Sequence, residues 1–155
     1  MILREHELTA WGGRIGREIG LPVFIGLSGP LGAGKSVLAR AVARGAGVSA
    51  PLPSPTFGLL FRYPARDGVE VVHADLYRLH DPEEIWELGW DELGAGREIV
   101  LVEWPERAGA YLPRERWEIR LSAPGPASPL RTVEVSRRGS PPSLPDCPGP
   151  IVRRG

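Results

Sequence analysis

The spacing of apolar residues predicts a chain of strands that alternate with helices. Apolar residues recur at helical spacing over residues 3–19 and again over residues 36–46. One or two short helices are predicted within residues 76–96, and a short helix or a loop over residues 105–113. Strand patterns, either continuously apolar or alternating with polar residues, occupy residues 23–28, 57–63, 69–75, 97–104, 117–123 and 131–137. This succession is typical of an α/β domain.

A change in composition near residue 139 divides the chain. Residues 1–138 contain all the periodic segments and form one predicted domain, within the usual domain size. Residues 139–155 hold five prolines and few apolar side chains, so the sequence predicts a flexible C-terminal tail. Within the first helical segment, Gly12 and Gly13 cost about 1 kcal/mol each relative to alanine. We therefore expect another element to pack closely against them.

Overall composition restricts the possible classes of function. Lysine plus arginine equals aspartate plus glutamate at 19 each, so there is no net field that would favour nucleic acid. The single cysteine excludes an internal disulfide framework and suits a reducing compartment. No apolar run approaches membrane-spanning length and the N-terminus lacks a signal-peptide pattern, so a cytoplasmic protein without a membrane segment is expected.

The sequence GPLGAGKS, residues 29–36, matches the phosphate-binding loop pattern G-x-x-x-x-G-K-[ST]. It lies between a predicted strand and a predicted helix, which is the context that such a loop requires. Its glycines let backbone N–H groups close on a polyphosphate, while Lys35, the only lysine, would reach the β- and γ-phosphates. The Ser36 hydroxyl would bind Mg²⁺. The predicted nucleotide-binding residues are therefore Gly29, Leu31, Gly32, Ala33, Gly34, Lys35 and Ser36.

Two acids at strand ends are candidates for the second half of the site. Glu103 follows the apolar run IVLV and is the preferred second Mg²⁺ ligand, while Asp75 would support the metal or orient an attacking water. A solvated strand-end acid is the alternative for each. Thr56, on a stiff proline-rich loop, is a candidate sensor of the γ-phosphate, or else forms a local turn hydrogen bond. Trp104 contributes either to the site or to the core.

Several motifs together resemble one family, the TsaE-type P-loop ATPases of tRNA threonylcarbamoyladenosine synthesis. The matching stretches occur in the family's order and are LSGPLGAGKS, SPTF at 54–57, HADLYRL at 73–79, ELGWDEL at 87–93 and LVEWPER at 101–107. The chain departs from the family pattern in having Ser36 where threonine is usual and Pro30 where an acid is frequent. It also has Leu8 at a position where a threonine is common in the first helix.

The resemblance implies a single P-loop domain with a mixed sheet flanked by helices, and ATP with Mg²⁺ as ligands. By position, Ser36 and Glu103 would hold Mg²⁺, Asp75 would assist hydrolysis, and Thr56 and Trp104 would be functional, Trp104 at the nucleotide. The ATPase would be slow alone. It would act on the two-subunit transferase complex of the pathway and reset that complex between turnovers, with tRNA involved only indirectly.

Other functions remain open from the residues alone. A P-loop kinase of a small metabolite is the main alternative, since arginines for a lid are abundant, and a nucleotide-dependent binding module with negligible hydrolysis is another. A GTPase is disfavoured because its guanine-binding motif needs a second lysine. Direct tRNA binding would depend on the arginines near the C-terminus, Arg137, Arg138, Arg153 and Arg154.

Overall fold

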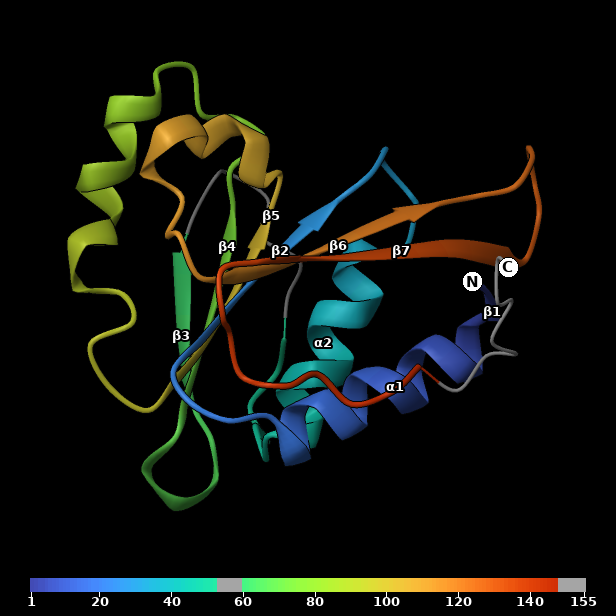
Figure 1. The fold of residues 1–155 in the computed structure, drawn as a ribbon, viewed down its shortest axis with the longest axis horizontal. Helices are drawn as coiled ribbons and strands as arrows, with labels where there is room; N and C mark the ends of the chain where they lie inside the picture. The colour runs from blue at the N-terminus through green and yellow to red at the C-terminus, as the bar shows by residue number, and fades with distance from the viewer. Residues whose placement is uncertain (53–59, 148–155) are drawn as a thin grey trace.

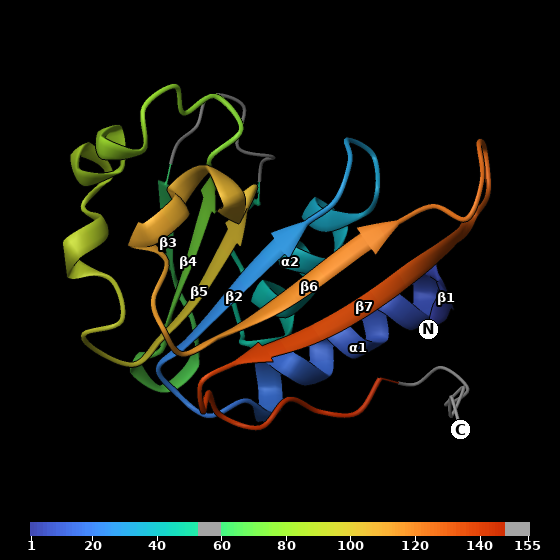
Figure 2. The ribbon, with the colours of Figure 1, turned by 45° about the horizontal axis from the view of Figure 1, so that its top comes forward.

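A seven-stranded mixed sheet forms the centre of the protein, as Figures 1 and 2 show. The computed structural model describes residues 1–52 and 60–147. The strands are β1 (Ile2–Arg4), β2 (Val23–Ser28), β3 (Leu60–Pro64), β4 (Glu70–Asp75), β5 (Glu98–Glu103), β6 (Arg116–Ser122) and β7 (Leu130–Arg138).

The strand order is β1-β7-β6-β2-β5-β4-β3. Strand β2 is central and runs parallel to β5 and β6, and β5 runs parallel to β4. Strand β3 runs antiparallel to β4, and β7 runs antiparallel to β6. The expected α/β fold with a mixed sheet flanked by helices is therefore confirmed, and the carboxyl ends of β2, β4 and β5 meet at one edge.

Helices α1 (Glu5–Glu18) and α2 (Lys35–Gly45) pack against each other and cover one face of the sheet (Figure 1). The predicted close packing at Gly12 is confirmed, since a Cβ there would lie 2.6 Å from the Ala41 side chain. At Gly16 a Cβ would lie 2.1 Å from the Val42 carbonyl oxygen. The glycines lower the helix propensity of α1, but because they lack a Cβ they allow the two helices to come into close contact.

Short 3₁₀ helices cover the opposite face. They are η2 (Pro82–Leu88), η3 (Trp90–Glu92) and η4 (Pro105–Tyr111), while η1 (Arg66–Gly68) forms the turn between β3 and β4. Asp81 caps η2 by accepting a hydrogen bond from the Glu83 N–H at 3.0 Å. A second core cluster, which contains Phe24, Ile85 and Trp90, fills the space between these helices and the sheet.

The N-terminal residues differ from the sequence prediction. Residues 3–19 were expected to be helical, but Ile2–Arg4 form strand β1, which pairs with the edge strand β7. Leu3 is fully buried there and joins the core cluster under α1 and α2. Edge pairing satisfies backbone groups of β7 that would otherwise be exposed, and the helix begins only at Glu5.

The C-terminal segment also differs from the prediction of a flexible tail beginning at residue 139. Residues 140–147 contact the domain, and two indole N–H groups donate to their carbonyl oxygens, Trp117 to Pro142 at 2.7 Å and Trp11 to Pro145 at 2.9 Å. Leu144 and Cys147 pack on the main core cluster. The proline-rich composition suggested nothing to bury, but the carbonyl oxygens of an extended proline-containing chain can accept hydrogen bonds from indole N–H groups.

Candidate functional site

The loop between β2 and α2 has the backbone conformation that its sequence predicts. Gly29 has φ of 131°, and a Cβ at this position would lie 1.9 Å from the Leu121 carbonyl oxygen. Gly34 is the left-handed N-cap of α2, with φ of 103° and no side-chain cap. The N–H groups at the start of α2 are therefore not taken by a capping side chain, and they can bind an anion with the help of the helix dipole.

Lys35 is held inside the loop. Its Nζ donates hydrogen bonds to the carbonyl oxygens of Gly29 and Pro30, at 2.5 and 2.9 Å, and lies 4.3 Å from the centre of the Trp104 ring. Burial lowers the pKa of this ammonium group, while the carboxylates of Glu103 and Asp75 oppose the shift. An ammonium so placed has lost part of its hydration, which strengthens its interaction with any phosphate that enters the loop.

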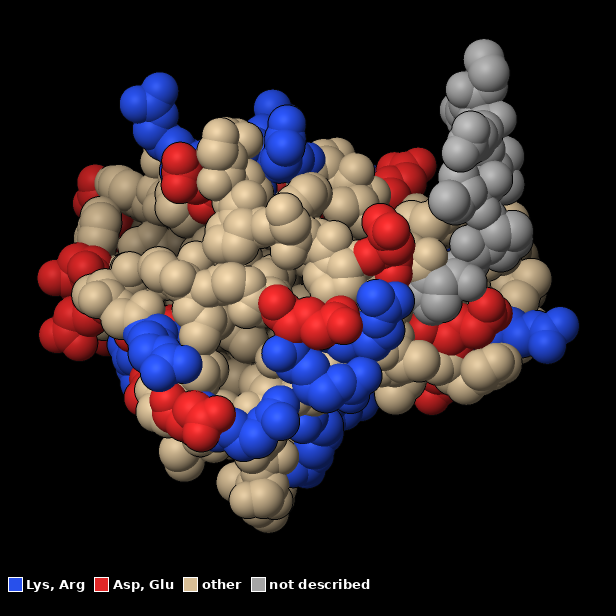
Figure 3. Space-filling model, turned by 60° about the horizontal axis from the view of Figure 1, so that its bottom comes forward, with Lys and Arg blue, Asp and Glu red and all other residues tan. Residues whose placement is uncertain are grey.

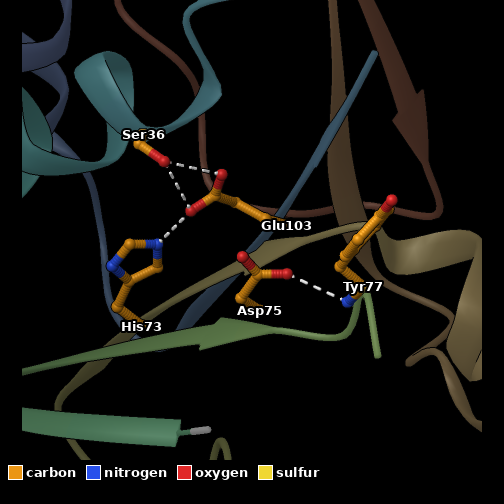
Figure 4. A network of polar contacts seen from close by, with 5 residues as sticks. All are labelled: Ser36, His73, Asp75, Tyr77 and Glu103. Carbon is orange, nitrogen blue, oxygen red and sulfur yellow. Dashed lines mark hydrogen bonds and ion pairs between the residues drawn. The ribbon is translucent and has the colours of Figure 1, made fainter. Parts of the chain in front are cut away.

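Glu103 is buried at the end of β5 between a hydroxyl and an imidazole, as Figure 4 shows. Ser36 Oγ lies 2.9 Å from Oε1 and 3.2 Å from Oε2, and His73 Nε2 lies 2.6 Å from Oε2. The prediction placed Ser36 and Glu103 together, and the structure brings them into direct contact. The contact of His73 with Glu103 was not predicted from the sequence.

The oxygens of Ser36 and Glu103 fit a magnesium site. Both are hard oxygen donors, and their 2.9 Å separation equals that of adjacent ligands in an octahedron with Mg–O distances of about 2.0–2.1 Å. No cluster of three or more His, Cys, Asp or Glu side chains suited to a metal occurs in the described ranges 1–52 and 60–147. Two protein ligands leave room for water and phosphate oxygens, which is how Mg²⁺ is usually held.

Asp75 stands beside Glu103 on the neighbouring strand. The two residues are register partners of parallel strands β4 and β5, so both side chains project from the same face of the sheet. Asp75 Oδ1 accepts a hydrogen bond from the Tyr77 N–H at 2.9 Å. Burial raises the pKa of this carboxyl group, which favours it as a proton acceptor relative to an ordinary aspartate.

Trp104 has left-handed backbone angles, φ 59° and ψ 49°, which are costly for a bulky residue. This conformation turns the chain immediately after Glu103 and places the indole against the ammonium group of Lys35. The centroid of the Tyr77 ring lies 5.0 Å from that of the Trp104 ring. Backbone strain of this kind occurs preferentially at functional sites, which favours the site interpretation of Trp104 over a purely structural one.

A cavity of about 240 Å³ collects most of the predicted residues. Its lining includes Leu31, Gly32, Gly34, Lys35, Ser36, Asp75, Glu103 and Trp104. Gly29 and Ala33 do not line it, since Gly29 packs on β6 and Ala33 joins the core. Thr56 lies outside the described residues.

Part of the cavity lining was not predicted from the sequence. Glu5, Leu8, Val37, Pro129 and Arg131 contribute to it, and Arg131 Nη2 lies 3.4 Å from the Gly32 carbonyl oxygen. Arg131 belongs to β7, which enters the site only because β1 and β7 extend the sheet beside α1. No local pattern marks it among eighteen arginines. His73 did carry a signal, because it lies two residues before Asp75 on a strand and therefore shares its face.

A second polar surface lies over the paired helices. A shallow groove between α1 and α2 is lined by Arg17, Arg40 and Arg44, and Figure 3 shows basic side chains gathered on this side of the molecule with acidic ones beside them. Arg44 donates to the carbonyl oxygens of Val48 and Ala50, so it also stabilises the chain after α2. No helix among residues 1–52 and 60–147 is long and apolar enough to span a membrane.

Comparison with known proteins gives one consistent family. The model of the family described as threonylcarbamoyl adenosine biosynthesis protein TsaE matches residues 2–129. The protein named tRNA threonylcarbamoyladenosine biosynthesis protein TsaE is 35% identical over 116 residues in Treponema pallidum (strain Nichols), covering 75% of this chain and 84% of that protein. In Bacillus subtilis (strain 168) the protein of that name is 39% identical over 100 residues, covering 64% of this chain and 61% of that protein.

The same name belongs to a Mycobacterium tuberculosis (strain ATCC 25618 / H37Rv) protein that is 37% identical over 125 residues, covering 76% of this chain and 74% of that protein. Among solved structures, the crystal structure of Bacillus subtilis YdiB is similar, with a TM-score of 0.68 and 26% identity. The similarity covers 90% of this chain and 86% of that one. The region matched by the family model contains the loop 29–36, Asp75 and Glu103.

Proposed function

The chain belongs to the TsaE family of proteins of tRNA threonylcarbamoyladenosine biosynthesis, and from this premise we propose that it is a magnesium-dependent ATPase of that modification. The observation that carries the proposal is the contact of Ser36 with Glu103 beside the loop that holds Lys35. A P-loop with a metal-binding hydroxyl and a strand-end carboxylate is the arrangement that Mg²⁺ and a nucleoside triphosphate require.

In the proposed mechanism each residue has a separate task. The N–H groups of the loop and of the first turn of α2 bind the phosphates, and the Lys35 ammonium group balances their charge. Ser36 and Glu103 would hold Mg²⁺, which would supply positive charge that stabilises the phosphates. Asp75, whose pKa is raised by burial, orients the attacking water and accepts its proton. Trp104 closes the side of the cavity against Lys35.

The proposed ATPase is slow until partner proteins complete its site. Arg131 is the one arginine that lines the cavity among the described residues, and its guanidinium group donates to the carbonyl oxygens of Ser128, Leu130 and Gly32. Arg131 would have to give up these contacts before it could stabilise charge in the transition state. We therefore propose that the two subunits of the transferase complex stimulate ATP hydrolysis. The hydrolysis would in turn reset that complex between turnovers.

Phosphate release from ATP tests this function. We would measure it for the purified protein with Mg²⁺, alone and with the two transferase subunits, and repeat it with Lys35→Met. Slow release that the subunits stimulate and that the variant lacks is the expected result. Turnover that appears only when a small-molecule acceptor is added would instead identify the protein as a metabolite kinase, and unchanged turnover in Lys35→Met would contradict the site itself.

A further inference from the structure

We propose that His73 is a positioning residue for the magnesium site. In this proposal its imidazole holds one oxygen of Glu103 so that the other oxygen stays directed at Ser36 and the metal. The inference rests on the proposed function, because it concerns the same carboxylate, but it assigns a role to a residue outside the nucleotide cavity.

The register of the sheet puts the three side chains of the network on one face. On parallel strands β4 and β5, His73 pairs with Leu101 and Asp75 pairs with Glu103. Side chains two residues apart on a strand share a face, so His73 lies on the α2 side together with both acids. From there the imidazole reaches diagonally across to Glu103, as Figure 4 shows.

The contacts divide the two carboxylate oxygens between two partners. His73 Nε2 lies 2.6 Å from Oε2. In the proposed arrangement Nε2 carries the proton and donates it in a hydrogen bond to the carboxylate, which in its ionised form only accepts hydrogen bonds. The Ser36 hydroxyl is closer to Oε1, at 2.9 Å, than to Oε2, at 3.2 Å. The terminal torsion of a glutamate is soft, so without the imidazole the carboxylate would be free to exchange its oxygens.

His73 can act only through Glu103. His73 is buried and does not belong to the lining of the cavity, and its contact with the site is through Glu103. Its neighbours on β4, Val71, Val72 and Ala74, are fully buried and apolar. An apolar residue would fill position 73 at lower desolvation cost, and the hydrogen bond to Glu103 is what compensates for burying an imidazole there.

The burial pattern of the whole molecule supports this role. Among the described residues, the buried polar or charged side chains are Lys35, His73 and Glu103. Two of them belong to the proposed nucleotide and metal site, and the third contacts it. Hydrogen bonds of this kind to a metal-binding carboxylate typically change metal affinity by about 10–100-fold when they are removed.

The test compares ATP affinity with Mg²⁺ and with EDTA in the full-length protein. We would titrate ATP into wild type, His73→Leu and His73→Gln, with His80→Gln on the exposed surface as a control. Leucine fills the space but removes the donor, whereas glutamine keeps an N–H at a similar reach. We expect magnesium to improve ATP affinity about 10-fold less in His73→Leu than in wild type, with affinity in EDTA unchanged and the glutamine variant close to wild type.

The outcomes separate this inference from the function on which it rests. Equal magnesium enhancement in wild type and His73→Leu would overturn the role of His73 and leave the magnesium site intact. If wild type itself gains no affinity from magnesium, the proposed metal site fails, and the role of His73 fails with it. A purely structural role would lower affinity equally with Mg²⁺ and with EDTA, and glutamine would not rescue it.

A spectroscopic measurement on the metal-free protein applies even where His73→Leu does not fold. The chain has three histidines, so long-range ¹H–¹⁵N spectra can resolve the imidazole of His73. We expect a proton on Nε2 that exchanges slowly with water, and faster exchange in Glu103→Ala. A His73 Nε2 without a proton in wild type would overturn the proposal.

Discussion

The two ends of the central strands are built from opposite kinds of side chain. At the carboxyl ends of β2, β4 and β5, charged and polar groups are buried together: Lys35, His73 and Glu103 are each at most 5% exposed. At the amino ends, a cavity of about 290 Å³ is lined mainly by aromatic and aliphatic residues and prolines, including Phe24, Trp90 and Pro142.

This difference suggests that the carboxyl ends of the strands serve ligand binding and that the amino ends serve stability. The desolvation of buried charged groups offsets much of what their contacts contribute, so we expect the carboxyl end to contribute little to the free energy of unfolding. The amino end gains from apolar contact, such as the edge-to-face pair of Phe24 and Trp90 with centroids 5.6 Å apart. Substitutions at the first end should therefore change nucleotide chemistry, and substitutions at the second should change the free energy of unfolding.

The largest effect is expected for Glu103→Gln. The amide keeps the shape of the side chain but removes the charge that holds Mg²⁺, so magnesium-dependent phosphate release should fall about 1,000-fold. The melting temperature should remain within about 2 °C of wild type, because a buried charge has been replaced by a neutral isostere. Full turnover in this variant would show that Asp75, not Glu103, is the metal-binding acid.

The second largest effect is expected for Lys35→Met. Methionine keeps the apolar stem over Trp104 and removes the ammonium group, so ATP affinity should fall about 100-fold, equivalent to about 2.7 kcal/mol. Titration calorimetry with Mg²⁺ measures this loss. Thermal unfolding without nucleotide is the control, and a collapse of stability together with affinity would mean that the carboxyl end is structural after all.

Truncation after Gly139 should affect the amino ends of the central strands. It removes the carbonyl acceptors of two indole N–H groups and exposes Trp11 and Trp117, so the free energy of unfolding should fall by about 2 kcal/mol. For a domain of this size the melting temperature should drop by about 4–8 °C. A variant ending at Cys147 retains these contacts and serves as the control. Lost ATP affinity without any drop in melting temperature would contradict the comparison.

Trp117→Phe gives the smallest and most local test. It removes the hydrogen bond to Pro142 at 2.7 Å and keeps most of the apolar contact, so it should cost about 1 kcal/mol. Chemical unfolding measures the change. The matched expectation is ATP affinity within about twofold of wild type, since Trp117 does not line the nucleotide cavity.

The residues at the carboxyl ends of the central strands could be predicted because short sequence patterns identify them. The loop 29–36 follows an apolar strand and opens a helix, and Asp75 and Glu103 end parallel strands, so strand geometry alone brings them to the same edge. The contact between Gly12 and α2 was also predictable, since glycine inside a helix needs a packing reason. The position of His73 on the same face as Asp75 could have been predicted from the two-residue periodicity of a strand.

The rest depends on contacts between distant parts of the chain. Strand β1 forms because β7 offers an unpaired edge. Its three residues are too few to show a strand pattern in the sequence. Arg131 reaches the cavity through that same extension of the sheet. Residues 140–147 pack because Trp11 and Trp117 offer indole donors more than twenty residues away, which a composition rich in proline cannot reveal.

The most direct test of the account is a crystal structure with Mg²⁺ and a non-hydrolysable ATP analogue. We expect phosphates in the loop 29–36, with the metal bound by Ser36 and Glu103 and with His73 still in contact with the second carboxylate oxygen. Nucleotide bound elsewhere, for example in the apolar cavity beside Phe24 and Trp90, or phosphates in the loop with no metal at Ser36 and Glu103, would contradict it.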